Sequence, residues 1–251
     1  MKLTVIGSGD AFGSGGRLQT CFHVATARTE FLIDCGATAM IGFNGLGLDP
    51  NRVSTIFISH LHGDHFSGLV WWMLHAEHVA RRTAPLDVVG PPGLRDRYNK
   101  LAEALFTGSA SRPHRFPLRF HEIADAVAVS INGVEVQPFV VSHPSGAPSY
   151  ALRFTVDGRI VGFSGDTEWV EALVEVARGA DLYITECYGY DSPTRYHMSW
   201  SGGASSLSAN LPRLTAKQIL LTHMSTPMLE QSEAVSGDRV IIAHDGMTLE
   251  L

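Results

Sequence analysis

The sequence predicts an α/β protein in which two sheets pack together with helices outside, forming one domain over residues 1–251. Three observations lead to this prediction. Segments typical of strands and helices alternate in both halves of the chain, no low-complexity linker separates the halves, and 45% of the 251 residues are hydrophobic. A chain of this length and composition can bury a substantial core, so we expect it to fold unaided.

In the first half, apolar stretches bounded by turn residues indicate strands near Lys2–Ile6, Thr20–Thr26, Glu30–Asp34, Val53–Ser59, Leu86–Val89 and Val134–Ser142. Two helices are expected between them, Phe66–Val79 and Leu94–Phe106, and the second follows a Pro-Pro-Gly sequence in the manner of a helix start. The segment Gly108–Phe120 contains two prolines and four Arg or His side chains, so we expect an exposed loop there.

The second half repeats this alternation. Ser149–Val156 and Arg159–Ser164 are joined by Asp157-Gly158, which predicts a hairpin. The remaining elements, in order, are expected to be helix Glu168–Ala177, strand Asp181–Thr185, helix Ser199–Leu211, strand Gln218–Thr222, a short helix about Pro227–Val235, and strands Arg239–Ala243 and Met247–Leu251.

Composition narrows the functional classes. The three cysteines are widely spaced, which argues against a disulfide framework or a thiolate zinc site and fits a reducing cytoplasm. The first residues are too briefly apolar for a signal sequence, and no stretch is long enough to span a bilayer, so we expect no membrane partner. The net charge of −6 opposes nonspecific binding to a polyanion, although two divalent cations would offset about four charges locally.

The segment His60-Leu61-His62-Gly63-Asp64-His65 places three imidazoles and one carboxylate directly after an apolar strand. His60 and His62 are two residues apart at a strand end and project to the same side. Asp64 and His65 lie beyond the turn at Gly63 and must point elsewhere. These are too many ligands for one metal ion, so the sequence predicts a site for two.

Further ligand candidates also follow apolar strands, namely His143, Asp166 and His223. Each is delivered to a loop at a sheet edge, where α/β proteins place reactive groups. A lone His or Asp in such a place is usually a capping residue, but together with the first motif these residues favour metal binding. A water shared by two divalent ions becomes a nucleophile near neutral pH, which predicts hydrolysis. Ligands without thiolate suit zinc, and manganese, iron and nickel stay open.

This ordered series resembles the ligand set of the metallo-β-lactamase superfamily of binuclear metallohydrolases, over nearly the whole chain. The resemblance implies a four-layer αβ/βα sandwich of two mixed sheets. It also implies that Asp166 bridges the two ions, that His60, His62 and His143 bind one of them, and that Asp64, His65 and His223 bind the other. Asp34, after a strand, would orient a metal-binding histidine by this resemblance, but an ordinary turn carboxylate is an equal interpretation.

Within the superfamily, the chain is most similar to the ribonuclease Z (tRNase Z) group and related phosphodiesterases. The similarity is carried by the opening 1–9 with Asp34-Cys35-Gly36, by Gly165-Asp166-Thr167, by Thr222-His223-Met224-Ser225 and by Asp245-Gly246-Met247. Ala37 departs from the group, which commonly has glutamate there.

The same resemblance bears on catalysis. Ile184-Thr185-Glu186 and His197-Met198-Ser199 look like the group's Glu and His-Ser-Thr elements. By this resemblance His197 acts as general acid toward the leaving alkoxide, Glu186 orients it, and Asp64 completes the catalytic set, with a metal-bridging hydroxide as nucleophile. The main prediction is therefore a phosphodiesterase. A tRNA 3′-processing endonuclease, or a hydrolase of lactones, thioesters or sulfate esters, is the alternative.

One departure from the ribonuclease Z group concerns the substrate. Bacterial members carry a long arm that grips tRNA between the positions of His143 and Asp166, where this chain has only the length of a hairpin. Together with the acidic net charge, this favours a small phosphodiester, such as a cyclic or mononucleoside diester or a phospholipid-derived one, over tRNA. Relatives often form dimers, so the resemblance also allows a homodimer.

Other features of the sequence have simpler interpretations. The glycine-rich segment 7–16 resembles a dinucleotide fingerprint but has Phe12 in the wrong place, so we expect a flexible loop that overlooks the site. His23, His75 and His78 are expected to be structural. For His244, which follows a strand as the ligands do, a structural role and a role in lining the pocket or contacting a ligand are equal interpretations. The basic series Arg112, His114, Arg115 and Arg119 could contact phosphate, although simple solvation is favoured.

Overall fold

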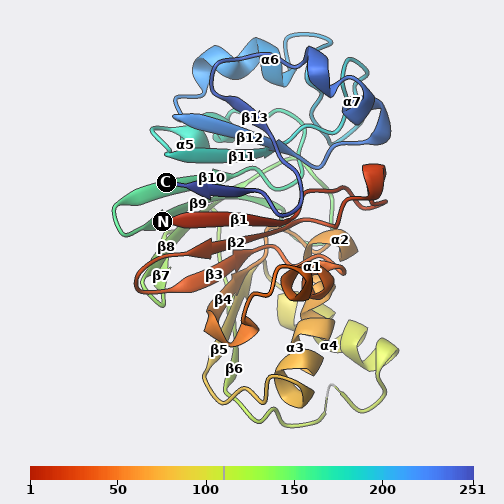
Figure 1. Ribbon diagram of the computed structural model, residues 1–251, viewed down its shortest axis with the longest axis vertical. Helices are drawn as coiled ribbons and strands as arrows, with labels where there is room; N and C mark the ends of the chain where they lie inside the picture. Colours follow the sequence, from red (N-terminus) through yellow and green to blue (C-terminus); the bar gives the residue numbers. More distant parts are fainter. Residues whose placement is uncertain (110) are drawn as a thin grey trace.

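The structure is a computed structural model that describes residues 1–109 and 111–251, and its strands form two mixed seven-stranded sheets (Figure 1). The order in the first sheet is β14 (Thr248–Glu250), β1 (Lys2–Gly7), β2 (Cys21–Ala25), β3 (Glu30–Ile33), β4 (Val53–Phe57), β5 (Leu86–Gly90) and β6 (Leu118–Glu122). The order in the second is β13 (Val240–Ile242), β12 (Gln218–Thr222), β11 (Leu182–Glu186), β10 (Arg159–Phe163), β9 (Tyr150–Val156), β8 (Val134–Val140) and β7 (Val129–Ile131).

Helices cover the outer face of each sheet. The first sheet carries α1 (Ala39–Gly45), α2 (Gly63–Phe66), α3 (Gly68–His78) and α4 (Leu94–Leu105), and the second carries α5 (Ala172–Ala177), α6 (Leu207–Asn210) and α7 (Thr226–Glu230). Short 3₁₀ turns occupy η1 (Ser14–Gly16), η2 (Pro50–Arg52), η3 (Leu211–Arg213) and η4 (Ser232–Ala234). Among the residues described, no helix combines the length and apolar character that crossing a membrane requires.

Three apolar layers hold the four structural layers together. The central one lies between the sheets, where Phe57 and Phe154 meet edge to face at 5.1 Å. Each outer layer lies between one sheet and its helices. This arrangement confirms the predicted αβ/βα sandwich, and it arises because strands buried on both faces need a second sheet on one side and helices on the other.

Parallel pairing brings several strand ends to one edge. β3, β4 and β5 run parallel in the first sheet, and β10, β11 and β12 run parallel in the second. Loops that follow these strands therefore emerge at the same edge of their sheet.

Some predicted elements differ from those observed. The predicted loop Gly108–Phe120 contains the start of strand β6 and the buried Phe116, and residue 110 within it lies outside the described part of the chain. Strands β6 and β7 were not expected because both are short edge strands and β6 is mostly polar. The predicted helix Ser199–Leu211 is reduced to α6, since Gly202 and Gly203 adopt positive φ angles of 103° and 135° that no α-helix accommodates.

Two other helices are shorter or divided. The helix expected over Glu168–Ala177 begins only at Ala172, and the one expected over Phe66–Val79 is two helices, α2 and α3, which meet at Ser67. The second half of the ligand motif is thus already helical, because α2 begins at Gly63.

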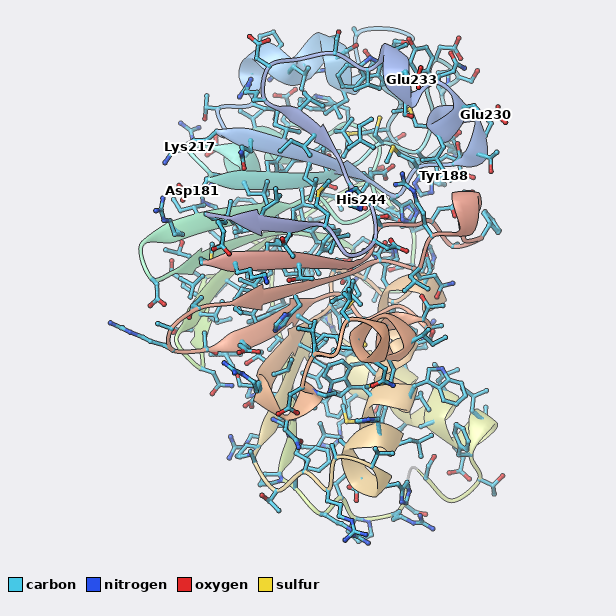
Figure 2. The ribbon with its side chains drawn as sticks, viewed as in Figure 1. Asp181, Tyr188, Lys217, Glu230, Glu233 and His244 are labelled. Carbon is cyan, nitrogen blue, oxygen red and sulfur yellow. The ribbon has the colours of Figure 1, made fainter. Side chains whose placement is uncertain are left out.

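Asp181, just before β11, links three segments at the end of the sheet opposite to the converging loops. Its carboxylate accepts hydrogen bonds from Lys217 Nζ at 2.8 Å, from Arg159 Nη1 at 3.1 Å and from the Ile160 backbone N–H at 2.9 Å, and Figure 2 shows it beside Lys217. Burial alone would raise the pKa of Asp181, but these partners outweigh it and lower the pKa to about 2.

We predict that Asp181→Asn lowers the free energy of unfolding by about 1 kcal/mol at pH 7. Because the folded-state pKa lies below the unfolded value of about 3.9, the carboxylate stabilises fully above about pH 5 and loses this effect as the pH falls toward 2. Urea unfolding at pH 7 and pH 3 should therefore show a smaller difference between variant and wild type at the lower pH. Glu175→Gln, at an exposed position of α5, is the control with little effect, and a pH-independent difference for Asp181→Asn would contradict the prediction.

Candidate metal centre

Four of the predicted ligands lie just after the ends of strands, and these strands come from both sheets. His60 follows β4, His143 follows β8, Asp166 follows β10 and His223 follows β12. Their side chains are buried, although they belong to loops. The edge at which the strands end therefore holds a compact polar cluster inside an otherwise apolar fold.

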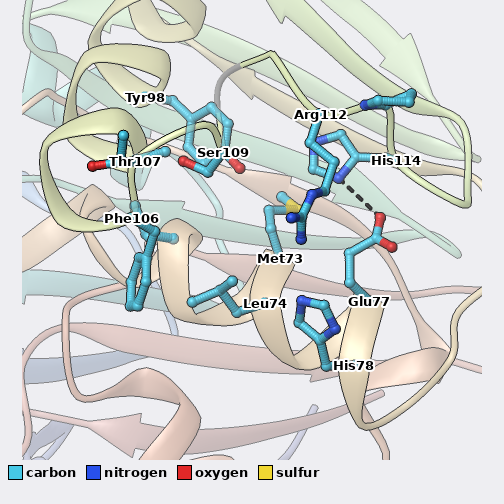
Figure 3. A pocket seen from close by; sticks show the side chains of 13 residues that line it. Met73, Leu74, Glu77, His78, Tyr98, Phe106, Thr107, Ser109, Arg112 and His114 are labelled. Atoms are coloured by element: carbon cyan, nitrogen blue, oxygen red, sulfur yellow. Dashed lines mark hydrogen bonds and ion pairs between the residues drawn. The ribbon is translucent and has the colours of Figure 1, made fainter.

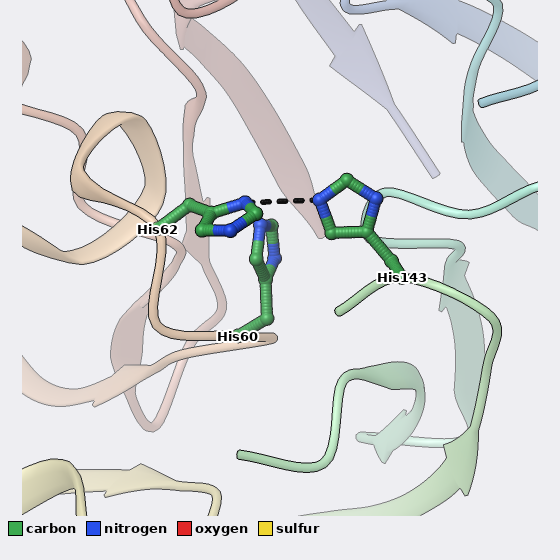
Figure 4. A group of neighbouring side chains, drawn as sticks. All are labelled: His60, His62 and His143. Atoms are coloured by element: carbon green, nitrogen blue, oxygen red, sulfur yellow. Dashed lines mark hydrogen bonds between the residues drawn. The ribbon is translucent and has the colours of Figure 1, made fainter. Parts of the chain in front are cut away.

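Two groups of side chains in this cluster have the spacing of metal ligands. His60, His62 and His143 form one group (Figure 4), and the second consists of Asp64, His65, Asp166 and His223. Within each group, one potential ligand atom per residue lies within 4.8 Å of all the others. The structure thus brings together all seven residues that the sequence analysis singled out.

Asp166 lies between the two groups. Its Oδ2 atom is 3.2 Å from His223 Nε2 and 3.3 Å from His65 Nε2 in one group. The same oxygen is 3.9 Å from the Nε2 atoms of both His60 and His143 in the other. This is the position that a carboxylate shared by two ions would need.

The other ring nitrogen of four histidines is held by a neighbour. His60 Nδ1 contacts Ser59 Oγ at 3.0 Å, and His65 Nδ1 contacts Asp34 Oδ2 at 2.6 Å. His143 Nδ1 donates to the carbonyl of Tyr196 at 3.0 Å, and His223 Nδ1 lies 3.3 Å from Thr20 Oγ1. These contacts fix the orientation of each ring and leave Nε2 for the centre of the cluster, as in metal sites of proteins.

The cluster contains buried nitrogen atoms that lack hydrogen-bond partners and that a metal ion would coordinate. The Nε2 atoms of His60 and His65 are buried, and neither makes a hydrogen bond. Buried nitrogen atoms without a partner are costly, so their presence in the middle of a ligand group indicates that another group completes them. The donors are imidazole and carboxylate without thiolate, a set that suits zinc and similar divalent ions.

The electrostatics of the cluster also favour a cation. Burial and the neighbouring histidines lower the pKa of His60 well below its usual value. Burial would do the same to His65, but Asp166, Asp64 and Asp34 outweigh it and raise the pKa of His65. The carboxylates therefore hold positive charge at this position, and a divalent ion would supply that charge while releasing the proton.

Asp34 orients His65, as the resemblance implied, and is not merely a turn carboxylate. It is fully buried and accepts hydrogen bonds from the backbone and hydroxyl of Ser59 at 2.7 and 2.8 Å in addition to its contact with His65. A side chain at Gly68 would meet the carbonyl of Gly36 at 2.1 Å, so the two glycines allow the loop of Asp34 to lie against the ligand motif.

Glu186 and His197 form a pair beside the cluster. Glu186 is 1% exposed, and its carboxylate contacts His197 Nδ1 at 3.1 Å while accepting backbone hydrogen bonds from Thr167 and Met198. Burial would lower the pKa of His197, but the charge and hydrogen bond of Glu186 outweigh it and raise the pKa to about 9. The His197 ring lies near His143 and Asp166, which places it at the mouth of the cluster.

The cluster opens into a pocket of about 180 Å³ whose wall includes residues that sequence reasoning did not single out. Tyr188 lies against the ring of His197, with 4.9 Å between centroids, and Phe12 and Ala11 come from the loop after β1. Tyr188 follows β11 and could have been found by the strand-end rule used for the ligands. The glycine-rich loop does overlook the site, as predicted.

The basic residues of the central segment lie elsewhere. His114 Nδ1 and the backbone of Arg115 contact Glu77 of α3, and Arg112 lines a separate, mainly apolar pocket between α3 and α4 (Figure 3). Arg119 pairs with Asp87. Among the described residues, none of these four lines the pocket at the metal cluster. This argues against the interpretation in which they contact phosphate.

The other histidines that were discussed from the sequence also have defined places in the structure. His23 is buried and pairs with Glu30 at 3.0 Å, which makes it structural. His75 and His78 lie in the last turn of α3, away from the cluster. His244 is exposed, its side chain contacts the carbonyl of Asp245, and it is not among the described residues that line the metal pocket.

Comparisons with known proteins agree with this geometry. Ribonuclease Z from Methanothermobacter thermautotrophicus is 25% identical over 305 residues, covering 100% of this chain and 97% of that enzyme. The short form of human tRNase Z superposes with a TM-score of 0.76 at 25% identity, covering 100% of this chain and 99% of the human one. The metallo-β-lactamase fold protein YhfI from Bacillus subtilis has a TM-score of 0.77 at 19% identity, covering 99% of both chains, and shares the fold.

The predicted superfamily and its ribonuclease Z-like character are therefore confirmed, and the chain is a metal-dependent hydrolase. A family model adds a narrower assignment that the sequence motifs did not suggest. The model described as anti-Pycsar protein Apyc1 matches residues 1–245. Since this match covers nearly the whole chain, the protein belongs to the Apyc1 family of anti-Pycsar proteins.

Proposed function

We propose that this hydrolase is a phosphodiesterase that acts on small phosphodiesters. The observation that carries the proposal is the pair of Glu186 and His197 beside the ligand cluster. A buried carboxylate holding one nitrogen of an imidazole, whose other nitrogen faces a pocket, is an arrangement suited to proton donation.

The seven clustered side chains are proposed to hold two divalent ions, with zinc as the metal that best suits the donors. One ion is assigned to His60, His62 and His143, the other to Asp64, His65 and His223, and Asp166 is shared. Bound there, the ions would activate a water and draw charge from the phosphate oxygens. Asp64 belongs to the catalytic set because it lies within the ligand group and lines the pocket.

The residues of the chain then have separable tasks. Glu186 fixes the His197 ring through Nδ1, and its remaining bonds to Thr167 and Met198 keep the carboxylate from rotating. His197 Nε2 is left to donate a proton to the departing alkoxide oxygen. The pocket wall formed by Tyr188 supports the imidazole on one face.

This division of tasks favours a phosphodiester over a lactone or β-lactam. An alkoxide expelled from phosphorus is a poor leaving group and gains about 10²–10⁴ in rate from a general acid. Ring-opening of an activated acyl compound needs such help less, so a dedicated donor held by a buried glutamate would have little purpose there.

Two features support a small substrate. Between His143 and Asp166 the chain forms strands β9 and β10 with a turn at Asp157, a length that supports the proposal that a tRNA-gripping arm is missing there. The match with the Methanothermobacter enzyme extends over 305 residues, more than the 251 of this chain, so that enzyme has insertions relative to it. The net charge of −6 further disfavours a polyanion.

An assay panel tests the proposal against its alternatives. Metal-loaded protein is expected to hydrolyse bis(p-nitrophenyl) phosphate and small nucleoside or glycerol diesters, with little or no cleavage of a precursor tRNA at its 3′ end. Efficient tRNA processing would favour the endonuclease alternative. Turnover of lactones, thioesters or sulfate esters without diesterase activity would overturn the proposal.

His197→Ala is expected to reduce kcat about 10²–10⁴-fold for a diester with an alkyl leaving group, and less than about tenfold for bis(p-nitrophenyl) phosphate. The difference arises because p-nitrophenolate leaves without protonation at neutral pH. Glu186→Gln, which keeps the shape but loses the charge, should show the same leaving-group dependence in weaker form.

His244→Ala is the matched control, since this exposed histidine lies outside the pocket and should leave both rates unchanged. Equal losses of His197→Ala on activated and unactivated esters would argue against the proton-donor role. Circular dichroism of each variant would separate chemistry from misfolding.

Asp34→Asn is expected to weaken zinc binding about 10- to 100-fold, measured by competition with a chromophoric chelator. The asparagine can still accept from Ser59 but presents no carboxylate to His65 Nδ1, so the ring loses its orientation. Asp49→Asn, at an exposed turn before β4, is the control. Unchanged affinity in both variants would show that Asp34 does not support the metal site.

A further inference from the structure

We propose that the pocket between α3 and α4 is a binding site for a small carboxylic acid whose apolar part has about the size of one phenyl ring. Among the described residues, this pocket shares no lining residue with the pocket at the metal cluster, and the inference does not depend on the proposed function. Its volume is about 220 Å³. An apolar protein cavity of about 150 Å³ holds one benzene ring, so the larger space here can accept a ring together with a carboxylate.

One side of the pocket is apolar and already formed. Met73 and Leu74 come from α3, Ala102 comes from α4, and Phe106 follows α4. Met73 and Ala102 are each 2% exposed, and the Phe106 ring packs edge to face against Trp71 with 5.2 Å between the ring centroids. The helices therefore present a packed apolar surface to the pocket, and a ring can contact it without rearrangement of the core.

Two hydroxyl groups of the wall lack partners. Ser109 Oγ is buried and makes no hydrogen bond among the described residues. Tyr98 is 5% exposed, and in the described part of the chain its hydroxyl has no hydrogen-bond partner either. Burial and the nearby Glu77 carboxylate raise the pKa of Tyr98 to about 12, so this hydroxyl is a donor at neutral pH. Because buried polar groups are nearly always paired, these two indicate a polar group that a ligand supplies.

The charges around the pocket favour an acid. Arg112 is exposed, lines the pocket and forms no ion pair or hydrogen bond with another described residue. The carboxylate of Glu77 also lines the pocket, but it already contacts His114 Nδ1 at 3.0 Å and accepts a hydrogen bond from the backbone of Arg115 at 2.9 Å. The Arg115 side chain adds an ion pair to it at 3.7 Å. The charge without a partner is thus the guanidinium of Arg112, which matches a carboxylate in charge and in planar shape.

The polar and apolar groups lie on different sides. In Figure 3, Tyr98, Ser109 and Arg112 lie along the upper side of the pocket, and Leu74 and Phe106 lie below them. An acid can therefore place its ring against the apolar side while its carboxylate contacts the hydroxyls and the guanidinium. A cationic ligand would meet Arg112, and a long acyl chain would leave most of its length in water.

The test uses metal-loaded protein with ¹³C-labelled methionine methyl groups and benzoate as the probe. The Met73 methyl lies at the pocket, whereas Met224 is buried directly after the predicted ligand His223. We expect the Met73 resonance to shift in a saturable manner, with a Kd of roughly 1 mM or below, and the Met224 resonance to stay unchanged. A shift of Met224 without one of Met73 would assign the acid to the metal cluster and overturn the proposal. No saturable shift of Met73 up to about 20 mM benzoate would also overturn it.

Arg112→Ala is expected to weaken benzoate binding about five- to thirtyfold and to leave binding of benzyl alcohol unchanged, because only the acid uses the guanidinium. Tyr98→Phe keeps the ring but removes the hydroxyl, so it should weaken benzoate binding about two- to tenfold. Arg95→Ala is the matched control, since Arg95 is an exposed residue of α4 that is not among those lining the pocket.

The comparison of the two ligands separates acid recognition from simple filling of an apolar space. Benzoate that binds wild type and Arg112→Ala equally, and no more tightly than benzyl alcohol, would show an apolar cavity without a site for the acid group. That result would overturn the proposal. Since binding is measured without turnover, it stands or falls separately from the phosphodiesterase assays.

Discussion

The structure depends on burying a group of carboxylates and imidazoles at one edge of an apolar sandwich. Asp34, Asp166 and His65 are almost fully inaccessible, and isolated charges in such a place would cost several kcal/mol each. They are tolerated because each one has partners. Asp34 is held by Ser59, and Asp166 lies within 4 Å of four histidines. A divalent ion in each group would coordinate the ligand atoms that still lack partners. Metal binding would therefore also stabilise the folded form of this edge.

Residues that support the cluster come from segments far apart in the chain. Hydrogen bonds therefore connect a segment near the N-terminus with one near the C-terminus. Asp245 accepts hydrogen bonds from the backbone of Ser8 at 2.8 Å and of Leu18 at 2.7 Å, fixing both ends of the loop that carries Phe12. Ser8 in turn accepts the backbone N–H of His223 at 3.0 Å. With β14 pairing against β1, the C-terminal residues thus brace the loop and a ligand together. This is the physical role of the Asp-Gly-Met motif found in the sequence.

The fold and the ligands could be predicted because their signals are local. A strand followed by His or Asp is visible in the sequence wherever it occurs, and the segment from His60 to His65 alone predicts a metal site. The bond between Asp34 and His65 was undecided because it depends on the close approach allowed by Gly36 and Gly68, which no local pattern encodes. The sequence analysis expected the loop of Phe12 near the site but not Phe12 itself in the pocket wall, for the same kind of reason. A phenylalanine in a glycine-rich loop gives no sign of exposure until the loop is placed beside strands from the other half of the chain.

Charge connects this geometry with the size of the substrate. With neutral histidines, two divalent ions would give the cluster a local excess of positive charge, whereas the whole chain carries −6. At physiological salt, charges interact over about 8 Å, so a single phosphodiester in the pocket would experience mainly the ions. A polyanion extending over the surface would instead meet the acidic remainder of the chain, which would repel it.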